Sequence, residues 1–312
     1  MIPITHLFII NPAAGSRDRT EYYRQQIEAA FDEHREPYRI AVSEGPGDCC
    51  RITNSAARTG EEYRIYACGG DGTLNEVVQG AAGFPNVSVT VFSGGSGNDF
   101  VKIFDDPKAF FDISKLLDAE EATFDLIRCN DEIAMNICSV GLDARIAKDV
   151  SNYKRIPLLH GFRAYVASTV INLFKGIAEH YTVEIEGQTF DGDHTFVCVC
   201  NGRFYGGGFN PVTEADPTDG LLDVLLVKRV NLLQVPGIIG KYKNGQYREL
   251  PHLVRHFRTK EIHIHFDKPT SINLDGETRL AESARMCVAE EKLRFFYPRD
   301  LSYNVKEAAP TK

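Results

Sequence analysis

The sequence lacks a long uninterrupted apolar run. Its longest apolar segment, 164–174, is broken by Ser168, Thr169 and Asn172, and it is far shorter than the roughly 20 residues that cross a bilayer. The first six residues contain no basic region followed by an apolar core and a small-residue cleavage site. We therefore expect a cytoplasmic protein without an export signal or a membrane span.

Paired cysteine motifs and an excess of basic residues are also missing. The eight cysteines form no Cys-x-x-Cys motif, and several fall inside apolar runs such as 196–200, which is typical of reduced core residues. The formal net charge of −8 argues against a nucleic-acid partner, because phosphate neutralisation needs a concentrated basic surface. One local exception, 241–260, carries six basic residues and a single acid. We expect a solvated face there, with a membrane-facing patch as the alternative.

Several common catalytic signatures are absent as well. The sequence has no Gly-x-x-x-x-Gly-Lys-Ser/Thr motif, which excludes a P-loop ATPase, and no dinucleotide fingerprint follows the first predicted strand. It also has no Gly-x-Ser-x-Gly nucleophile elbow, so acyl transfer has no support. His263 and His265 share a predicted strand face, but no third ligand has suitable spacing, and we expect no zinc site there.

The sequence does contain a glycine-rich stretch, 69–73, directly after the apolar run 63–68. Three glycines in four residues let the backbone approach a ligand closely, and the helix predicted to follow offers free N–H groups and a positive dipole end to a phosphate. Asp71 could act through a divalent cation, and Thr73 could cap the helix or contact a phosphate. The alternative is a tight strand-to-helix turn in which both side chains only cap.

Three more loops of small residues follow predicted strands in the first half of the chain. The predicted strands 4–10, 38–42 and 87–92 end in the loops 11–16, 43–47 and 93–100. Helical segments separate the four strands, which predicts an open α/β sheet with right-handed crossovers. Ligands of such sheets lie beyond the carboxyl ends of the strands. The four loops together therefore favour a nucleotide site over a plain turn.

The second half of the chain is richer in strands. The apolar and alternating runs predict strands at 122–129, 133–140, 181–185, 195–200, 221–227, 261–266, 271–274 and 286–296. A helix is predicted to start at 141–144, and another spans 162–178. This pattern predicts a β-sandwich-like second domain.

Three motifs of the second half contain candidate chemistry. The loop 201–208 places three consecutive glycines after a strand, which suggests close approach by a ligand. The segment 216–223 packs three aspartates around a turn, which is either a site for a hard cation or a plain Asp-Gly turn. The segment 273–277 predicts a hairpin, because Asp-Gly is a strong two-residue turn signal. Glu277 at its exit is then either a surface acid or a positioned base.

The order of these motifs resembles the soluble lipid kinases built on the diacylglycerol kinase catalytic domain, which include bacterial diacylglycerol kinases and the sphingosine and ceramide kinases. The resemblance rests on seven ordered segments that cover nearly the whole chain: 11–15, 69–73, 95–100, 141–144, 201–208, 216–223 and 275–277. The segment 69–73 alone would be ambiguous, because NAD kinases share it. The change of pattern along the chain places the domain boundary near 126–130. With the resemblance, we expect residues 1–127 to form an ATP-binding α/β domain and residues 128–297 a β-rich lipid-substrate domain, with residues 298–312 able to pack back on the first. The resemblance also implies an active site in the cleft between the domains.

The resemblance further implies ATP and Mg²⁺ as cofactors and a role for each matching residue. Asp71 would orient magnesium and the γ-phosphate, and Glu277 would be the general base for the lipid hydroxyl. Asp216, Asp219 and the Leu221 carbonyl would hold a structural magnesium, and Asp125 would join Asp99 in an acidic network. The residues that would contact ATP or line its loops are Asn11, Ser43, Gly69, Gly70, Gly72, Thr73, Gly95, Ser96, Asn98 and Asp99.

The acceptor implied by the resemblance is a membrane lipid, most simply diacylglycerol, with a sphingoid base or another lipid alcohol as the alternative. Apolar side chains of 157–174 could accommodate its chains, with ordinary core as the alternative. Lys154, Arg155 or Arg163 could add positive charge at the transferred phosphate, with solvent-exposed basic residues as the alternative. The protein would then contact the inner membrane face reversibly, and a homodimer is left open. Two rival functions remain: an NAD kinase, and a non-catalytic nucleotide-binding regulator.

Overall fold

The computed structural model describes residues 4–15, 17–93, 98–153 and 177–303. The chain forms two units, one built from Met1–Asp125 together with Glu290–Asn304 and the other from Leu126–Ala289. Several expected features lie outside the described residues. They are Gly95, Ser96, Lys154, Arg155, Arg163, the apolar segment 157–174 and most of the helix predicted at 162–178.

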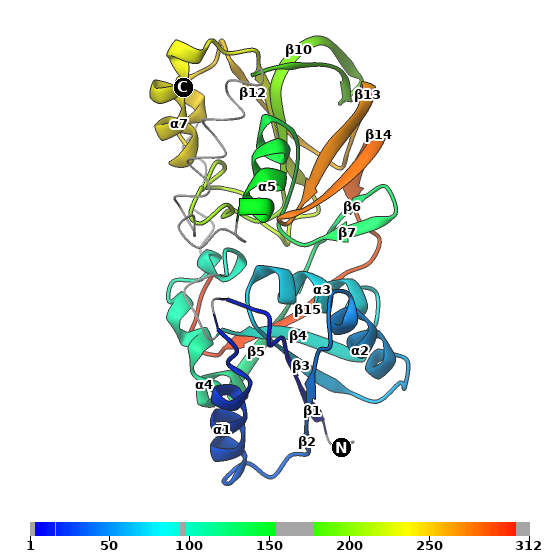
Figure 1. The fold of residues 1–312 in the computed structure, drawn as a ribbon, viewed down its shortest axis with the longest axis vertical. Coiled ribbons are helices and arrows are strands. Elements are labelled where there is room, and N and C mark those ends of the chain that lie inside the picture. The colour runs from blue at the N-terminus through cyan, green and yellow to red at the C-terminus, as the bar shows by residue number, and fades with distance from the viewer. Residues whose placement is uncertain (1–3, 16, 94–97, 154–176, 304–312) are drawn as a thin grey trace. The chain divides into compact units, whose positions relative to one another are not determined.

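The first unit is a six-stranded sheet with helices on both faces (Figure 1). Its strands run in the order β2-β1-β3-β4-β15-β5, and all pairs except β15–β5 are parallel. The strands are β1 (Thr5–Ile10), β2 (Tyr38–Val42), β3 (Tyr63–Cys68), β4 (Val87–Phe92), β5 (Ala119–Phe124) and β15 (Leu293–Pro298). The helices are α1 (Thr20–Phe31), α2 (Asp48–Ala57), α3 (Asp71–Ala81) and α4 (Ile113–Leu117), with the short 3₁₀ helices η1 (Phe100–Ile103) and η2 (Pro107–Phe111).

The helices explain why the central strands read as continuous apolar runs. α2 packs on α3 and α1 on α4, so both faces of the sheet are covered, and all six residues of β4 are buried. Phe8 of β1 stacks on Tyr66 of β3 at a centroid distance of 4.1 Å, and Tyr66 meets Phe296 of β15 edge to face. The predicted alternation of four strands and helices, with all four strands parallel, is confirmed.

The single strand predicted at 286–296 is wrong. The chain leaves the second unit after β14 (Glu277–Val288), and β15 inserts between β4 and β5 of the first sheet. The strand predicted at 122–129 is likewise two strands in different sheets, β5 and β6 (Ile127–Cys129). In each case two apolar runs lie so close in the sequence that local hydrophobicity does not mark the crossing between units.

The second unit is a nine-stranded antiparallel β-structure, which confirms the predicted β-sandwich-like domain. β9 pairs with both β10 and β13, as β8 does, so these strands wrap around a core of aliphatic residues. The remaining strands are β7 (Glu132–Ala134), β8 (Ile137–Gly141), β9 (Glu179–Ile185), β10 (Gln188–Cys200), β11 (Leu222–Lys228), β12 (Val254–Thr259) and β13 (Glu261–Leu274). Its helices are α5 (Leu142–Tyr153), which starts where the sequence predicts, α7 (Val235–Lys243), and the 3₁₀ helices η3 (Leu232–Gln234) and η4 (Tyr247–Glu249).

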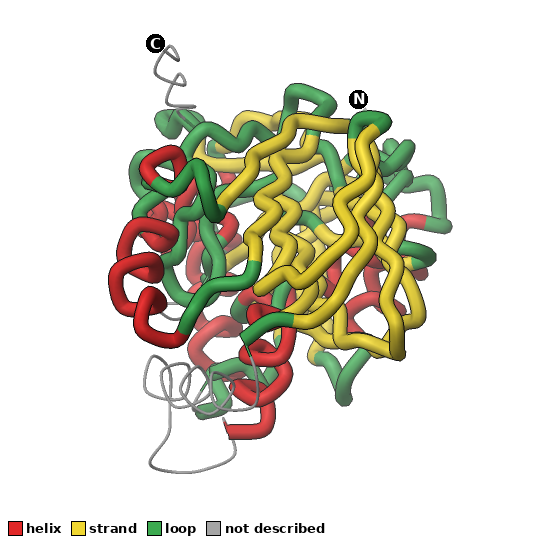
Figure 2. The backbone as a smooth tube through the Cα atoms, turned by 90° about the horizontal axis from the view of Figure 1, so that it is seen from above, coloured by secondary structure: helices red, strands yellow, loops and turns green. Residues whose placement is uncertain are grey.

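A second apolar cluster of this unit lies between its strands and α7. Figures 1 and 2 both show α7 to one side of the strands. Cys198, Leu225 and Tyr242 belong to this cluster, which is separate from the core that β9 and β13 enclose.

The strands predicted at 261–266 and 271–274 are one strand, β13, with an irregularity between His265 and Thr270. Pro269 in this interval cannot donate to the ladder, which explains why the sequence pattern breaks there.

Candidate active site

The four loops predicted to bind phosphate follow strands that are neighbours in the sheet. β2, β1, β3 and β4 lie side by side and parallel, so their carboxyl ends share one edge. The chain runs from β1 to β2 on one side of β1 and then crosses to β3 on the other side, so the strand order reverses between β1 and β3. This reversal makes the carboxyl ends of β1 and β3 a topological switch point. Ligands of open α/β sheets bind at such a point.

Asn11 and Thr73 bridge this switch point. The Asn11 amide Nδ2 donates to the Thr73 hydroxyl over 3.1 Å, and the Asn11 backbone N–H donates to the Cys68 carbonyl over 3.2 Å. Thr73 is buried, and a Cβ placed on Gly69 would lie 2.2 Å from its hydroxyl oxygen. Gly69 is therefore required by the packing of Thr73. This gives part of the glycine-rich stretch a structural role beside any contact with a phosphate.

Asp71 is the first residue of α3, and its side chain connects two of the loops. Its Oδ1 accepts a hydrogen bond of 2.7 Å from the backbone N–H of Asp99. The Asn98 amide oxygen in turn accepts from the N–H groups of Phe100 and Val101 at the start of η1. Asp71, Asn98 and Asp99 thus lie together as the sequence predicts, whereas Gly95 and Ser96 of the same loop are outside the described residues.

No sequence pattern indicates that Glu76 holds the loop after β2. Its carboxylate on α3 accepts from the backbone N–H groups of Gly47 and Cys49 at the start of α2, over 2.8 and 3.1 Å. Ser43, the predicted nucleotide contact in this loop, is buried, and its N–H donates to the Ile10 carbonyl. Glu76 therefore fixes the loop after β2 to the helix that begins at Asp71.

The acidic network predicted around Asp99 and Asp125 is partly neutralised within the first unit. Asp99 forms an ion pair with Lys102, and the buried Asp125 forms one with Lys292, which lies just before β15. The sequence did not indicate the second pair, because the return of the chain at residue 290 was not predicted.

In the second unit, the predicted hairpin places Glu277 at the start of β14. Asp275 and Gly276 form the turn with positive φ angles of 50° and 96°, as expected for Asp-Gly between antiparallel strands. Glu277 is more than half exposed, and its carboxylate lies 3.9 Å from the Arg279 guanidinium. An exposed carboxylate at a rigid turn can accept a proton from a hydroxyl brought to it.

Asp275 holds this turn in place. Its carboxylate accepts hydrogen bonds from three successive backbone N–H groups, those of Met135, Asn136 and Ile137, at distances from 2.6 to 3.3 Å. Asn136 extends the contact, because its amide donates to the Phe204 carbonyl, and its carbonyl accepts from Asn201 and Gly202. The turn of Glu277, the segment before β8 and the glycine loop 201–208 are therefore one hydrogen-bonded assembly.

We expect Asp275→Ala to destabilise the second unit. The change leaves three part-buried N–H groups without their charged acceptor, and the free energy of unfolding should fall by about 3 kcal/mol. Urea unfolding followed by circular dichroism measures the change. Asp131→Ala, which removes an exposed aspartate from the turn between β6 and β7, is the matched control. An equal effect of the two substitutions would contradict the role assigned to Asp275.

The residues predicted to bind a structural magnesium lie in a turn before β11. The Asp216 carboxylate accepts from the N–H and hydroxyl of Thr218, and the Asp219 carboxylate accepts from the Leu221 N–H and pairs with Arg258. Burial raises the pKa of Asp219, and the neighbouring Asp216 and Asp223 act in the same direction, although Arg258 opposes them. Two carboxylates and the Leu221 carbonyl form an all-oxygen donor set, which fits a hard cation. The Arg258 guanidinium supplies part of the positive charge that a bound cation would provide at this turn. The sequence did not indicate this ion pair.

Arg258 belongs to the basic segment 241–260, and other cations of this segment are also paired. Lys241 pairs with Glu249, and Arg248 pairs with Glu214, which lies outside the segment. Acids outside the segment therefore neutralise part of its positive charge, in addition to Glu249 within it. This favours the expected solvated face over a strongly charged membrane patch.

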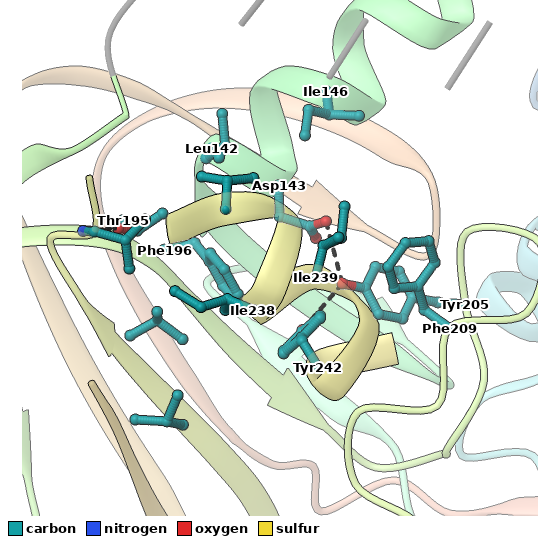
Figure 3. Close-up of a pocket in the computed structure, with 14 residues that line it drawn as sticks. Leu142, Asp143, Ile146, Thr195, Phe196, Tyr205, Phe209, Ile238, Ile239 and Tyr242 are labelled. Atoms are coloured by element: carbon teal, nitrogen blue, oxygen red, sulfur yellow. Dashed lines mark hydrogen bonds between the residues drawn. The ribbon is translucent and has the colours of Figure 1, made fainter. Parts of the chain in front are cut away.

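The second unit contains an apolar pocket between its strands, α5 and α7 (Figure 3). The cavity measures about 70 Å³. Aliphatic and aromatic side chains dominate its lining, among them Ile146, Phe209, Val230, Ile238 and Ile239. A pocket of this composition takes an apolar ligand.

A chain of hydroxyls and one carboxylate forms the polar part of the pocket. The Tyr205 hydroxyl contacts the Tyr242 hydroxyl at 3.0 Å and donates to Asp143 Oδ1 at 3.2 Å (Figure 3). Burial raises the pKa of Asp143, although hydrogen bonds from Ser139 and Tyr205 oppose the shift. The sequence singled out Tyr205 and Asp143 only as members of two motifs, and their contact joins the glycine loop 201–208 to α5.

The same chain leads back to the turn of Glu277. Ser139 donates to Asp143 over 2.6 Å and accepts from the Asn273 amide, whose oxygen accepts from the Gly276 N–H. Hydrogen bonds therefore connect the pocket with the turn that carries the predicted base.

Comparison with known proteins identifies the class of protein that this architecture represents. Residues 5–129 match the family model of the diacylglycerol kinase catalytic domain, and residues 136–297 match the YegS C-terminal NAD kinase beta sandwich-like domain. Two Staphylococcus aureus proteins, from strains JH9 and N315, carry the name "Putative lipid kinase"; each is 26% identical over 267 residues, which cover 84% of this chain and 87% of the relative.

Solved structures show the same fold. The crystal structure of a diacylglycerol kinase from Bacillus anthracis strain Sterne superposes with a TM-score of 0.66 at 18% identity and covers 95% of this chain and 97% of that chain. A second structure from the same strain reaches a TM-score of 0.71 at 21% identity, with the same coverage.

The chain belongs to the family of lipid kinases that combine these two domains, and it is a phosphotransferase. The family predicted from the motifs is confirmed. Within the described residues, none of the helices is both long and apolar enough to cross a membrane.

Proposed function

We propose that this protein transfers the γ-phosphate of ATP to the hydroxyl of a membrane lipid, most simply diacylglycerol, which gives phosphatidic acid. The observation that carries the lipid assignment is the apolar pocket of the second unit, whose hydrogen bonds lead to the turn of Glu277. A soluble dinucleotide such as NAD has no use for a pocket lined by aliphatic side chains. The pocket therefore favours a lipid kinase over an NAD kinase.

The nucleotide loops supply most of the chemistry, because phosphoryl transfer depends mainly on positioning and charge neutralisation. The N–H groups at the start of α3 and the loops around Asn11, Ser43 and Asn98 hold the phosphates of ATP. Asp71 is the carboxylate that would hold Mg²⁺, which neutralises charge on the phosphate oxygens when bound. Glu277 accepts the proton of the lipid hydroxyl.

The turn of Asp216, Asp219 and the Leu221 carbonyl would hold a second, structural Mg²⁺. Hard cations prefer carboxylate and carbonyl oxygens, and the negative charges of Asp216 and Asp223 beside Asp219 favour a cation there. Arg258 of β12 pairs with Asp219 and supplies part of the positive charge at this turn.

The lipid acceptor implies reversible contact with the inner face of the cytoplasmic membrane. The ion pairs of Lys241, Arg248 and Arg258 leave less charge for such contact than the sequence predicts. We then expect apolar contact through the lipid chain to contribute more to membrane binding than the charged segment does. A sphingoid base or another lipid alcohol would use the same pocket and the same base.

We expect Ile239→Trp to weaken the use of long-chain lipids. Ile239 lies on α7 at the pocket and is about one-third exposed, so an indole can enter the cavity without disturbing the core. The KM for long-chain diacylglycerol in detergent micelles should rise on the order of tenfold, while the KM for ATP stays unchanged. Initial rates at varied lipid and varied ATP concentrations measure both.

The matched control is Leu233→Trp, which adds the same indole at a side chain that is 95% exposed and outside the pocket. Its KM values should equal those of the wild type. If the two variants have the same lipid KM, the pocket does not bind the acceptor chain.

A further inference from the structure

Two histidines and a glutamate converge at the opposite end of the first sheet from the nucleotide loops. His6 lies near the start of β1, roughly 16 Å along the strand from Asn11, and His34 and Glu36 lie in the connection between α1 and β2. Glu36 Oε2 contacts His6 Nε2 at 2.8 Å and His34 Nε2 at 2.9 Å. Within the described residues, this is the only group of three or more histidines, cysteines or acids whose ligand atoms all lie within 4.8 Å of one another.

We propose that His6, His34 and Glu36 form a binding site for a divalent transition metal such as zinc. Two imidazoles and one carboxylate are a common zinc ligand set, with a water molecule in the fourth position. Bond lengths of 2.0–2.1 Å in a tetrahedral site separate ligand atoms by about 3.3 Å. The ligand atoms of Glu36 and the two histidines therefore need to move apart by only about half an ångström, and two of the three residues lie on a loop.

The surroundings of the two imidazoles are already arranged for a metal. The other ring nitrogen of His6, Nδ1, lies 2.8 Å from the buried Tyr66 hydroxyl. With a metal on Nε2, the ring proton resides on Nδ1 and is donated to the Tyr66 oxygen, which is the outer contact typical of metal-bound histidine. Phe31 packs edge to face on both imidazoles, with centroid distances of 5.2 Å to each, and thereby restricts their rotation.

The site is open to solvent, because the side chains of His34 and Glu36 are 31% and 42% exposed. A metal ion can therefore reach the three ligand atoms from outside.

Zinc binding to the whole chain tests the site directly. The protein is stripped with a chelator and dialysed against zinc chloride, and bound zinc is counted by atomic emission for the wild type, His34→Ala and Glu36→Gln. Each variant should bind one zinc fewer per chain than the wild type. Zinc should raise the melting temperature of the wild type by several degrees more than that of either variant, because a ligand that binds only the folded state stabilises it.

His180→Ala is the control, since His180 lies beside Asp191 and Asp267 at 3.7 and 3.3 Å, but these three residues do not form a convergent ligand group. This variant should bind as much zinc as the wild type. Cobalt in place of zinc should give the intense visible absorption of a tetrahedral site in the wild type and lose it in His34→Ala. Equal zinc stoichiometry and equal melting shifts in the wild type and both ligand variants would overturn the proposal.

Discussion

Asp71→Asn should reduce phosphoryl transfer by a factor of at least about 10³ and leave the fold intact. The asparagine oxygen can still accept the 2.7 Å hydrogen bond from the Asp99 N–H, so the two loops stay joined. Only the negative charge that would hold Mg²⁺ at the transferred phosphate is lost. Asp71→Ala removes the hydrogen bond as well and should be equally inactive. Steady-state rates with saturating ATP and lipid, together with thermal melting, separate the loss of activity from a loss of stability.

The matched control is Asp112→Asn. Asp112 precedes α4 and accepts a hydrogen bond of 2.9 Å from the Ser114 N–H. Like Asp71, it is an aspartate at the start of a helix of the first unit that accepts from a backbone N–H, but it lies outside the nucleotide loops. This variant should melt slightly lower than the wild type and keep its rate. A wild-type rate in Asp71→Asn would remove Asp71 from the metal-holding role.

Glu277→Gln should lower kcat by a factor of about 10² or more and leave the KM for ATP unchanged. Glutamine has the shape of glutamate but cannot accept a proton from the lipid hydroxyl. The turn should keep its conformation, because Asp275 and Gly276 determine it. Stopped-time assays over varied ATP, and nucleotide binding measured by calorimetry, distinguish slower chemistry from weaker binding.

Glu282→Gln is the control on the same strand, since Glu282 is exposed on β14 and has no assigned role. It should retain the wild-type kcat. A Glu277→Gln variant with the kcat of the wild type would show that Glu277 is an ordinary surface acid.

Local patterns were sufficient to predict strands β1 to β4 of the first sheet and the loops that follow them. Each of the strands β1 to β4 is an apolar run that ends in small residues, and parallel order places those ends at one edge. The hairpin at Asp275 followed from its turn chemistry alone, because few residues other than Asn, Asp and Gly tolerate two successive positive φ angles.

The parts that could not be predicted depend on contacts between distant residues. Asp275 binds backbone N–H groups about 140 positions earlier in the chain, and Asp219 in the turn before β11 pairs with Arg258 of β12. The return of β15 to the first sheet has the same origin, because an apolar strand carries no mark of which sheet it joins. His6 and Glu36 are separated by a whole helix, so their spacing matches no metal motif.

The transfer of labelled γ-phosphate from ATP to separate acceptors tests the central claim most directly. The protein is incubated with Mg²⁺ and labelled ATP, and with diacylglycerol, a sphingoid base, undecaprenol or NAD in separate reactions. We predict label in the extracted lipid with diacylglycerol, none with NAD, and none with any acceptor in Asp71→Asn. Label in NAD alone would identify an NAD kinase. Label that stays in ATP with every acceptor would contradict a lipid kinase and favour a nucleotide-binding regulator.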